Sequence, residues 1–183
     1  IDNGNAWRDS ELTPKSIGVV QHLEMLCEDF KPEGEIFDNF LMNTVIPYVE
    51  NNFPVCTDRQ NVAVCGSSSG GLMSFFSAFE HPEKFGYAGV FSPAFLCYTR
   101  EDWAKYLSTK IVENMPYLYI YTGNGDELEE MIFESTEMLY ELLEESFYPY
   151  DRMNEVILFE NAHNEKSWRE IFPDFLHTFL SRL

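Results

Sequence analysis

Long apolar runs and basic residues are both scarce in this sequence of 183 residues, and each scarcity excludes a class of protein. No uninterrupted apolar run approaches the roughly 20 residues that a membrane-spanning helix needs, so we expect no membrane segment. Lys and Arg number 12 against 31 Asp and Glu, which gives a net charge of −19. Because such a charge repels phosphates, the sequence argues against a nucleic-acid partner and favours neutral or weakly charged substrates.

Motifs for metal and phosphate binding are also missing. The four cysteines, Cys27, Cys56, Cys65 and Cys97, form no CxxC pair, so a structural zinc site has little support. There is no phosphate-binding glycine loop and no cluster of metal ligands, and we expect no cofactor. The simplest account of the cysteines is four free thiols in a reducing cytoplasm. A removed signal peptide is the alternative, because the chain lacks an initiator Met.

The composition predicts a folded domain. Apolar residues make up 45% of the chain and aromatic residues 16%, enough for a core that offsets the entropy of ordering. With no internal repeat and no linker, residues 1–183 are predicted to form a single domain. Many of the carboxylates gather between residues 126 and 145, a pattern typical of the solvated face of a helix.

Short apolar runs alternate with helical patterns from residue 35 onward. Strands are predicted at four such runs, 61–66, 87–91, 117–122 and 155–159. Helices are predicted at five stretches, 35–49 with a kink at Pro47, 70–80, 101–108, 126–147 and 166–183. This alternation predicts an α/β fold with a mostly parallel sheet and helices on both faces. Ligands bind such sheets at the carboxyl ends of the strands.

The segment Gly66-Ser67-Ser68-Ser69-Gly70 matches the pattern G-x-S-x-G, directly after a predicted strand and before a predicted helix. The chain must reverse there within a few residues, so a side chain at either glycine is expected to collide with neighbouring backbone. We expect a strained Ser68 to be a nucleophile beside a helix N-terminus, with the N–H of Ser69 binding an oxyanion. A Gly-Ser turn without a catalytic role is the alternative.

A serine nucleophile needs a base, and the chain has four histidines. His163 lies in a loop directly after a predicted strand and before a helix, which places it at the same sheet edge as Ser68. His22 precedes the serine, against the usual order of serine, acid and histidine. His81 ends a helix and His177 lies within the last one. The sequence therefore predicts His163 as the base, with a loop histidine satisfied by local hydrogen bonds as the alternative.

The acid of a triad is expected after the strand at 117–122. Asp126 follows that strand through a turn with two glycines, and it is also placed to cap the next helix. Glu127 is a competitor for the triad position. We favour Asp126 because it comes first after the turn and its shorter side chain suits a position beside the strand end. The predicted triad is therefore Ser68, His163 and Asp126.

With these residues assembled, the chain resembles the putative esterase family of α/β-hydrolases, which includes esterase D, enterochelin esterases, and the feruloyl and acetyl-xylan esterases of plant cell-wall breakdown. Five segments carry the resemblance in the family's order: RDSELTP at 8–14, VIPYV at 45–49, GSSSGGL at 66–72, FSPAF at 91–95 and HNEKSW at 163–168. The resemblance implies an α/β-hydrolase fold. It also implies a serine esterase that forms an acyl-enzyme, on an ester such as a carbohydrate- or siderophore-linked one.

One departure from the family concerns the start of the chain. Several strands, and the loop that supplies the second oxyanion N–H, precede the family's counterpart of residues 1–14. Ile1 resembles the last residue of a strand whose body is absent. We therefore expect this chain to be the C-terminal portion of a longer α/β-hydrolase domain.

Two other functions use the same pattern. An acyltransferase has the same triad but passes the acyl group to an acceptor other than water, and a binding module keeps the fold without catalysis. The segment after the strand at 87–91 adds a candidate acyl pocket, for which packing in the core is the simpler interpretation of each residue. Its members are Phe91, Phe95, Leu96, Tyr98 and Trp103.

Overall fold

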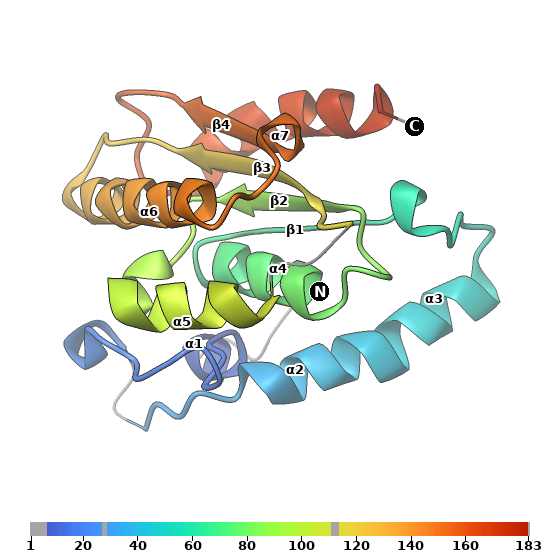
Figure 1. Ribbon diagram of the computed structural model, residues 1–183, viewed down its shortest axis with the longest axis horizontal. Helices are drawn as coiled ribbons and strands as arrows, with labels where there is room; N and C mark the ends of the chain where they lie inside the picture. The colour runs from blue at the N-terminus through green and yellow to red at the C-terminus, as the bar shows by residue number, and fades with distance from the viewer. Residues whose placement is uncertain (1–6, 27–28, 111–113, 183) are drawn as a thin grey trace.

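The computed structural model describes residues 7–26, 29–110 and 114–182, and a four-stranded parallel sheet lies at its centre (Figure 1). The strands are β1 (Ala63–Ser67), β2 (Tyr87–Phe91), β3 (Tyr117–Thr122) and β4 (Met153–Ile157). They lie in the order β1-β2-β3-β4, and every neighbouring pair is parallel. The predicted α/β class and parallel sheet are confirmed.

Helices cover both faces of this sheet. They are α4 (Ser69–Glu80), α5 (Arg100–Lys110), α6 (Glu127–Glu145) and α7 (Glu165–Leu180). Each crossover from β1 to β4 moves in the same direction along the sheet, so a constant hand places α4, α5 and α6 on one side. Helix α7 follows the last strand and covers the opposite face (Figure 1).

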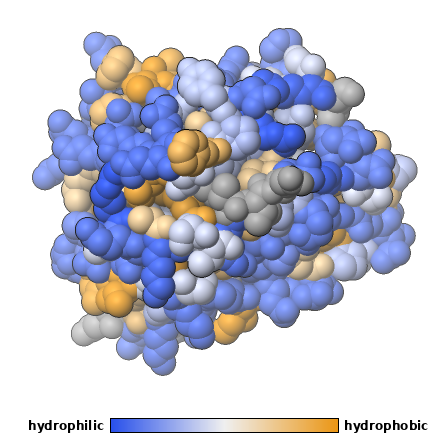
Figure 2. Space-filling model, viewed as in Figure 1, coloured by the Kyte–Doolittle hydropathy of each residue, from blue (hydrophilic) through white to orange (hydrophobic). Residues whose placement is uncertain are grey.

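The core forms two apolar layers because successive strand residues point to opposite faces. Ala88, Val90 and Leu118 face α4 and α6 in the larger layer. On the other face, aromatic side chains of β2 and β3 pack against Ile171 and Phe175 of α7. The outside is mostly hydrophilic, with small scattered apolar patches in the view of Figure 2.

The first third of the chain forms the layer below α4 and α5 in Figure 1. Its helices are α1 (Arg8–Glu11), η2 (Leu23–Met25), α2 (Gly34–Phe40), η3 (Leu41–Val45) and α3 (Ile46–Asn52). Pro47, where the sequence predicts a kink, lies in the first turn of α3, two residues after the π-helical turn η3; proline has no N–H to continue the α-helical ladder. Three single 3₁₀ turns complete the list: η4 (Arg59–Asn61), η5 (Phe95–Cys97) and η6 (Tyr150–Arg152).

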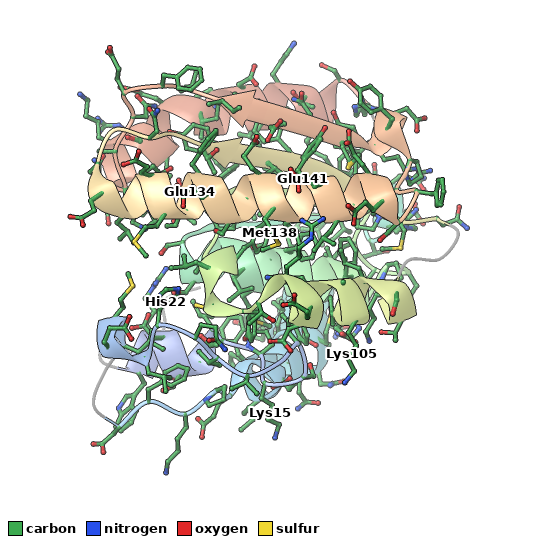
Figure 3. All side chains as sticks on the ribbon, turned by 60° about the vertical axis from the view of Figure 1, so that its left-hand side comes forward. Lys15, His22, Lys105, Glu134, Met138 and Glu141 are labelled. Atoms are coloured by element: carbon green, nitrogen blue, oxygen red, sulfur yellow. The ribbon has the colours of Figure 1, made fainter. Side chains whose placement is uncertain are left out.

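The acidic face and two strands take their expected place, whereas two strands are shifted: β1, predicted at 61–66, is Ala63–Ser67, and β4 is shifted as well. Glu134 and Glu141 lie on the exposed face of α6, as the acidic pattern predicted (Figure 3). Strands β2 and β3 have their predicted bounds. Strand β4 begins and ends two residues earlier than predicted, because the chain turns away from the sheet after Ile157 and leaves Phe159 64% exposed.

Strand β1 forms one edge of the sheet. It pairs with β2 on one side, and Cys65 at its centre is exposed. Cys56 and Cys65 are exposed free thiols and Cys97 is a buried one, whereas Cys27 lies outside the described residues. The strand end expected at Ile1 also lies outside them.

Candidate active site

Ser68 occupies a sharp turn between β1 and α4. Its backbone angles are φ 59° and ψ −125°, a conformation that costs energy for any residue with a side chain. The turn is tied to the end of β2: the N–H of Ser68 donates to the carbonyl of Phe91 at 2.9 Å, and its carbonyl accepts from the N–H of Ala94 at 3.1 Å. These bonds hold the hydroxyl at the carboxyl edge of the sheet.

The glycines around Ser68 are not equivalent. A Cβ on Gly66 would lie 2.4 Å from the carbonyl oxygen of Gly70, and one on Gly71 would lie 2.9 Å from that of Phe91. A Cβ on Gly70 would meet only a guanidinium nitrogen of Arg8, at 3.9 Å. The expectation that a side chain would collide at either glycine of the motif is therefore wrong for Gly70. Gly66 and Gly71 are the residues that let the turn close.

His163 lies in contact with Ser68. Its Nε2 is 3.0 Å from Ser68 Oγ, although 95 residues separate the two in the sequence. The imidazole is 10% exposed, and the ring of Trp168 packs against it edge to face, with ring centroids 5.1 Å apart. The loop that carries it leads into α7, whose first turn is capped by the side-chain oxygen of Asn164.

The other histidines have different positions, although His22 lines a cavity that Ser68 also lines. His81 lies at the end of α4, and its Nε2 is 2.6 Å from a carboxylate oxygen of Asp38 in α2. This hydrogen bond raises the pKa of His81. His177 is exposed on α7. His22 contacts Glu24 on the N-terminal segment, where Figure 3 labels it.

The carboxylate that contacts the imidazole is that of Glu129, and this corrects the expectation of Asp126. Glu129 Oε2 lies 2.6 Å from His163 Nδ1. The other carboxylate oxygen, Oε1, accepts hydrogen bonds from Ser92 Oγ at 2.6 Å and from the N–H of Gly123 at 2.8 Å. Its side chain is fully buried, and three donors satisfy it.

Asp126 takes the alternative role that the sequence left open for it, the N-cap of α6. Its Oδ1 accepts from the N–H of Glu129 at 2.8 Å, and its Oδ2 accepts from the backbone N–H of His163, also at 2.8 Å. The hydrogen bond from Glu129 lowers the pKa of Asp126, and the one from His163 adds to it. Its side chain thus supports the histidine loop without contacting the imidazole. Glu127, the competitor, is exposed.

A signal for Glu129 was present in the sequence. The buried residues of α6 recur at helical spacing, and Glu129 occupies the same stripe as Ile132, Thr136, Leu139 and Leu143. A carboxylate on an apolar stripe needs buried partners, so its position favours a functional role over a solvated one. Asp126 was favoured because it comes first after the turn, and that position belongs to the N-cap of α6, one turn before Glu129.

The turn after Ser68 leaves a backbone N–H free of the helix, at the residue for which the sequence predicts an oxyanion donor. Ser69 begins α4, so its backbone N–H has no intrahelical acceptor. Its side chain is fixed by the N-terminal segment: Ser69 Oγ accepts from Arg8 Nη1 at 3.2 Å and donates to Asp9 Oδ1 at 3.3 Å. Arg8 also donates to the carbonyl of Ser67 at 3.2 Å. A guanidinium therefore lies beside the candidate nucleophile in a strongly acidic protein.

A cavity of about 190 Å³ opens beside Ser68 and Ser69. Arg8 and Asp9 line its polar side, and its apolar lining comes from several elements: Met25, Leu26, Ala94, Leu96, Leu128 and Ile132. Of the aromatic pocket considered from the sequence, only Leu96 lines this cavity. Phe95, Tyr98 and Trp103 are at most 2% exposed and pack in the core.

Within the described ranges, no group of three or more His, Cys, Asp or Glu side chains is arranged so that it could hold a metal ion. None of the helices in those ranges is long and apolar enough to cross a membrane.

Comparisons with known proteins give the site a context. The family described as Putative esterase matches residues 26–179. A curated endo-1,4-β-xylanase/feruloyl esterase of Xylanibacter ruminicola is 32% identical over 107 residues, which are 58% of this chain and 13% of that protein. The siderophore hydrolase EstA of Aspergillus nidulans is 20% identical with a TM-score of 0.69, over 96% of this chain and 69% of that one.

The enterochelin esterase of Shigella flexneri has the same fold, with 19% identity and a TM-score of 0.67 over 78% of this chain. The chain spans 36% of the length of that enzyme. The family match covers the strand–turn–helix of Ser68, the helix of Glu129 and the loop of His163. The chain therefore belongs to the putative esterase family of α/β-hydrolases.

Proposed function

We propose that this protein is a serine esterase in which Ser68 is the nucleophile, His163 the general base and Glu129 the carboxylate that orients the base. The observation that carries the proposal is the pair of contacts on one imidazole: Nε2 at 3.0 Å from Ser68 Oγ and Nδ1 at 2.6 Å from Glu129 Oε2. A hydroxyl, an imidazole and a buried carboxylate in this order are the arrangement of a serine hydrolase.

The chemistry follows from these positions. Ser68 Oγ attacks the ester carbonyl carbon while its proton passes to His163 Nε2. Glu129 stabilises the imidazolium, and the N–H of Ser69 donates to the oxyanion. The intermediate collapses as His163 returns the proton to the departing alcohol, which leaves an acyl group on Ser68. Water, activated by the same imidazole, then releases the acid.

The substrate class is drawn from the relatives and the cavity. The relatives include enzymes named for feruloyl esters and for siderophores, and family membership supports ester hydrolysis. The net charge of −19 disfavours polyanionic substrates, and the cavity beside Ser68 combines apolar walls with the ion pair of Arg8 and Asp9. We propose esters of small organic acids, hydroxycinnamoyl and siderophore esters among them.

The test uses the full-length protein with a panel of p-nitrophenyl, hydroxycinnamoyl and siderophore esters. Ser68→Ala is expected to lower kcat by several orders of magnitude and to abolish labelling by a fluorophosphonate. Ser67→Ala changes the neighbouring residue and is the matched control, which should keep both the ester turnover and the fluorophosphonate labelling. Undiminished turnover in Ser68→Ala would remove the proposal. Labelling without hydrolysis, together with ester formation in the presence of an alcohol acceptor, would assign acyl transfer instead.

A further inference from the structure

Glu129 is held on the side opposite His163 by two residues that have no part in the mechanism above. Ser92 Oγ donates to Glu129 Oε1 at 2.6 Å, and the indole Nε1–H of Trp168 donates to Ser92 Oγ at 2.9 Å. With the two contacts of His163, these bonds form an unbroken row of side chains from Trp168 to Ser68. We refer to it as the Trp168–Ser68 row.

With Glu129 ionised and His163 neutral, one arrangement of hydrogens fits the row. An indole N–H can only donate, so Ser92 Oγ accepts from Trp168 and its own hydroxyl hydrogen is left for Glu129. An ionised carboxylate can only accept, so His163 carries its proton on Nδ1. The lone pair on Nε2 then faces Ser68. This is the tautomer that a general base requires.

Ser92 is built into the fold in a way that a packing residue does not require. It follows β2 directly, is fully buried and has a positive φ of 41°. Its N–H donates to the carbonyl of Tyr121 at 2.7 Å, which fixes it against the end of β3. Residues other than glycine rarely adopt positive φ, and those that do cluster at functional sites. The strained backbone directs this hydroxyl at Glu129.

Trp168 lies in the first turn of α7, five positions after His163. The side chain of Asn164, the residue directly after His163, caps this turn and so ties the loop that carries the imidazole to the turn that carries the indole. The same ring also packs edge to face on the imidazole. Trp168 therefore limits the orientation of His163 by direct contact and, through Ser92, the orientation of Glu129.

We infer that Ser92 and Trp168 are positioning residues, which hold Glu129 as an oriented acceptor and His163 in its reactive tautomer; the inference rests on the proposed function. Ser92 acts on Glu129 directly, and the indole N–H acts through Ser92. Neither side chain contacts the reacting atoms.

The experiment measures kcat, KM and the pH dependence of kcat/KM for Ser92→Ala, Trp168→Phe and the double variant in the full-length protein. Loss of the charge-assisted bond in Ser92→Ala is expected to lower kcat about 10- to 100-fold, with KM changed less than about twofold. Because Glu129 then keeps more negative charge for the imidazolium, the acid limb should move upward by about half a pH unit. Asp126, the other charged group beside His163, is untouched by these variants.

Trp168→Phe tests the direction of action. It keeps an aromatic ring against His163 but removes the indole N–H, and we expect a smaller loss of kcat, about 3- to 10-fold. In the Ser92→Ala background this loss should disappear, because the N–H has no hydroxyl left to orient. A role in packing alone predicts the same loss in both backgrounds, and that result would overturn the inference for Trp168.

Controls separate positioning from folding. Ser135→Ala removes another buried hydroxyl, one that bonds a carbonyl of its own helix, and should leave kcat and the acid limb unchanged. Should Ser92→Ala not fold, Ser92→Gly accommodates the positive φ while lacking the hydroxyl, and the same shifts are expected. Unchanged kcat and acid limb in a folded Ser92 variant would overturn the inference.

A readout independent of turnover distinguishes this inference from the proposed function. The Nδ1 proton of His163, bonded to Glu129, is expected as a low-field resonance in the proton NMR spectrum. Its chemical shift or line width should change in Ser92→Ala, whatever the substrate of the protein. A shift of this resonance without esterase activity would support the row and reject the proposed function. An unshifted resonance in an active enzyme would reject the positioning role of Ser92 and Trp168 and leave the proposed function in place.

Discussion

Asp126 and Glu129, one helical turn apart, hold the same histidine in two different ways. Asp126 accepts the backbone N–H of His163 at 2.8 Å, whereas Glu129 contacts its Nδ1 at 2.6 Å. The first contact positions the loop and the second orients the imidazole. The two carboxylates should therefore respond differently to the loss of their charge.

Glu129→Gln should lower kcat by about 10³- to 10⁴-fold, the effect of an amide in place of a triad carboxylate. Ser92 and Gly123 both donate to Oε1, so the amide oxygen is expected to remain there and the amide nitrogen to face His163. A donor at that position favours the tautomer with its proton on Nε2, which cannot accept from Ser68. Steady-state kinetics compares this variant with Asp126→Asn, which should stay within about tenfold of the wild type. The opposite ranking would make Asp126 the acid.

Asp126 should contribute to stability in a pH-dependent way. Asp126→Ala removes the N-cap of α6 and the acceptor for His163 N–H, and we expect a loss of about 1–2 kcal/mol at pH 7. The folded-state pKa of Asp126 is lowered from 3.8, so its charged form contributes above that value and the contribution is lost as pH falls through the lower pKa.

Urea unfolding at neutral pH and at about pH 3 measures this difference. Asp126→Asn is the control, because asparagine caps a helix as well as aspartate but does not titrate. The free energy of unfolding of Asp126→Asn should lie below that of the wild type at neutral pH, and this difference should shrink toward zero as pH falls. A constant difference across the range would show that the charge of Asp126 is not involved.

The two glycines of the G-x-S-x-G motif offer a matched pair. Gly66→Ala should destabilise the fold by about 2–4 kcal/mol, because the new methyl group meets the carbonyl of Gly70 at 2.4 Å. Gly70→Ala adds a methyl group in open space, in the first turn of α4 and without a positive φ to relieve. It should leave stability unchanged or raise it by up to about 1 kcal/mol. Equal losses in urea unfolding would contradict this account of the turn.

The sequence predicted those parts of the site that depend on residues close together in the chain. Ser68 and the strand–turn–helix around it follow from five consecutive residues, and His163 follows from a loop between a strand and a helix. The two lie together because both loops leave the carboxyl edge of the same parallel sheet. That convergence is a property of the fold class, so it could be predicted.

Contacts that depend on side-chain direction could not be read in the same way. Asp126 and Glu129 both follow β3, and only the packing of α6 decides which carboxylate turns under the imidazole. Ser92 lies in the segment FSPAF that carries part of the family resemblance, but its contacts could not be predicted, because its hydroxyl meets Glu129 and Trp168 only where β2, α6 and α7 come together. The segments that follow the four strands thus carry Ser68, Ser92, Glu129 and His163 in turn. The G-x-S-x-G motif marks only Ser68.

A pair of carboxylates far from the site should make stability depend on pH in the opposite direction from Asp126. Burial raises the pKa of Glu155 on β4 from 4.5 to about 7, and a hydrogen bond with Glu137 of α6 adds to the shift. Within the described part of the chain, its Oε1 is buried without a hydrogen-bond partner. The folded state therefore holds a proton that the unfolded state releases near pH 4.5. Stability from this group is present below that pH and is lost as pH rises toward 7.

Glu155→Gln mimics the protonated side chain at every pH. Its melting temperature should match that of the wild type near pH 4 and exceed it increasingly up to about pH 7, above which the gain should stay constant, as measured by thermal unfolding from pH 4 to pH 8. Glu134→Gln removes an exposed carboxylate from the same helix α6 and is the control, with little expected change at either pH. Since the wild type must ionise Glu155 beside Glu137 and Glu144, a gain that is equal at pH 5 and pH 8 would show that the raised pKa is not the cause.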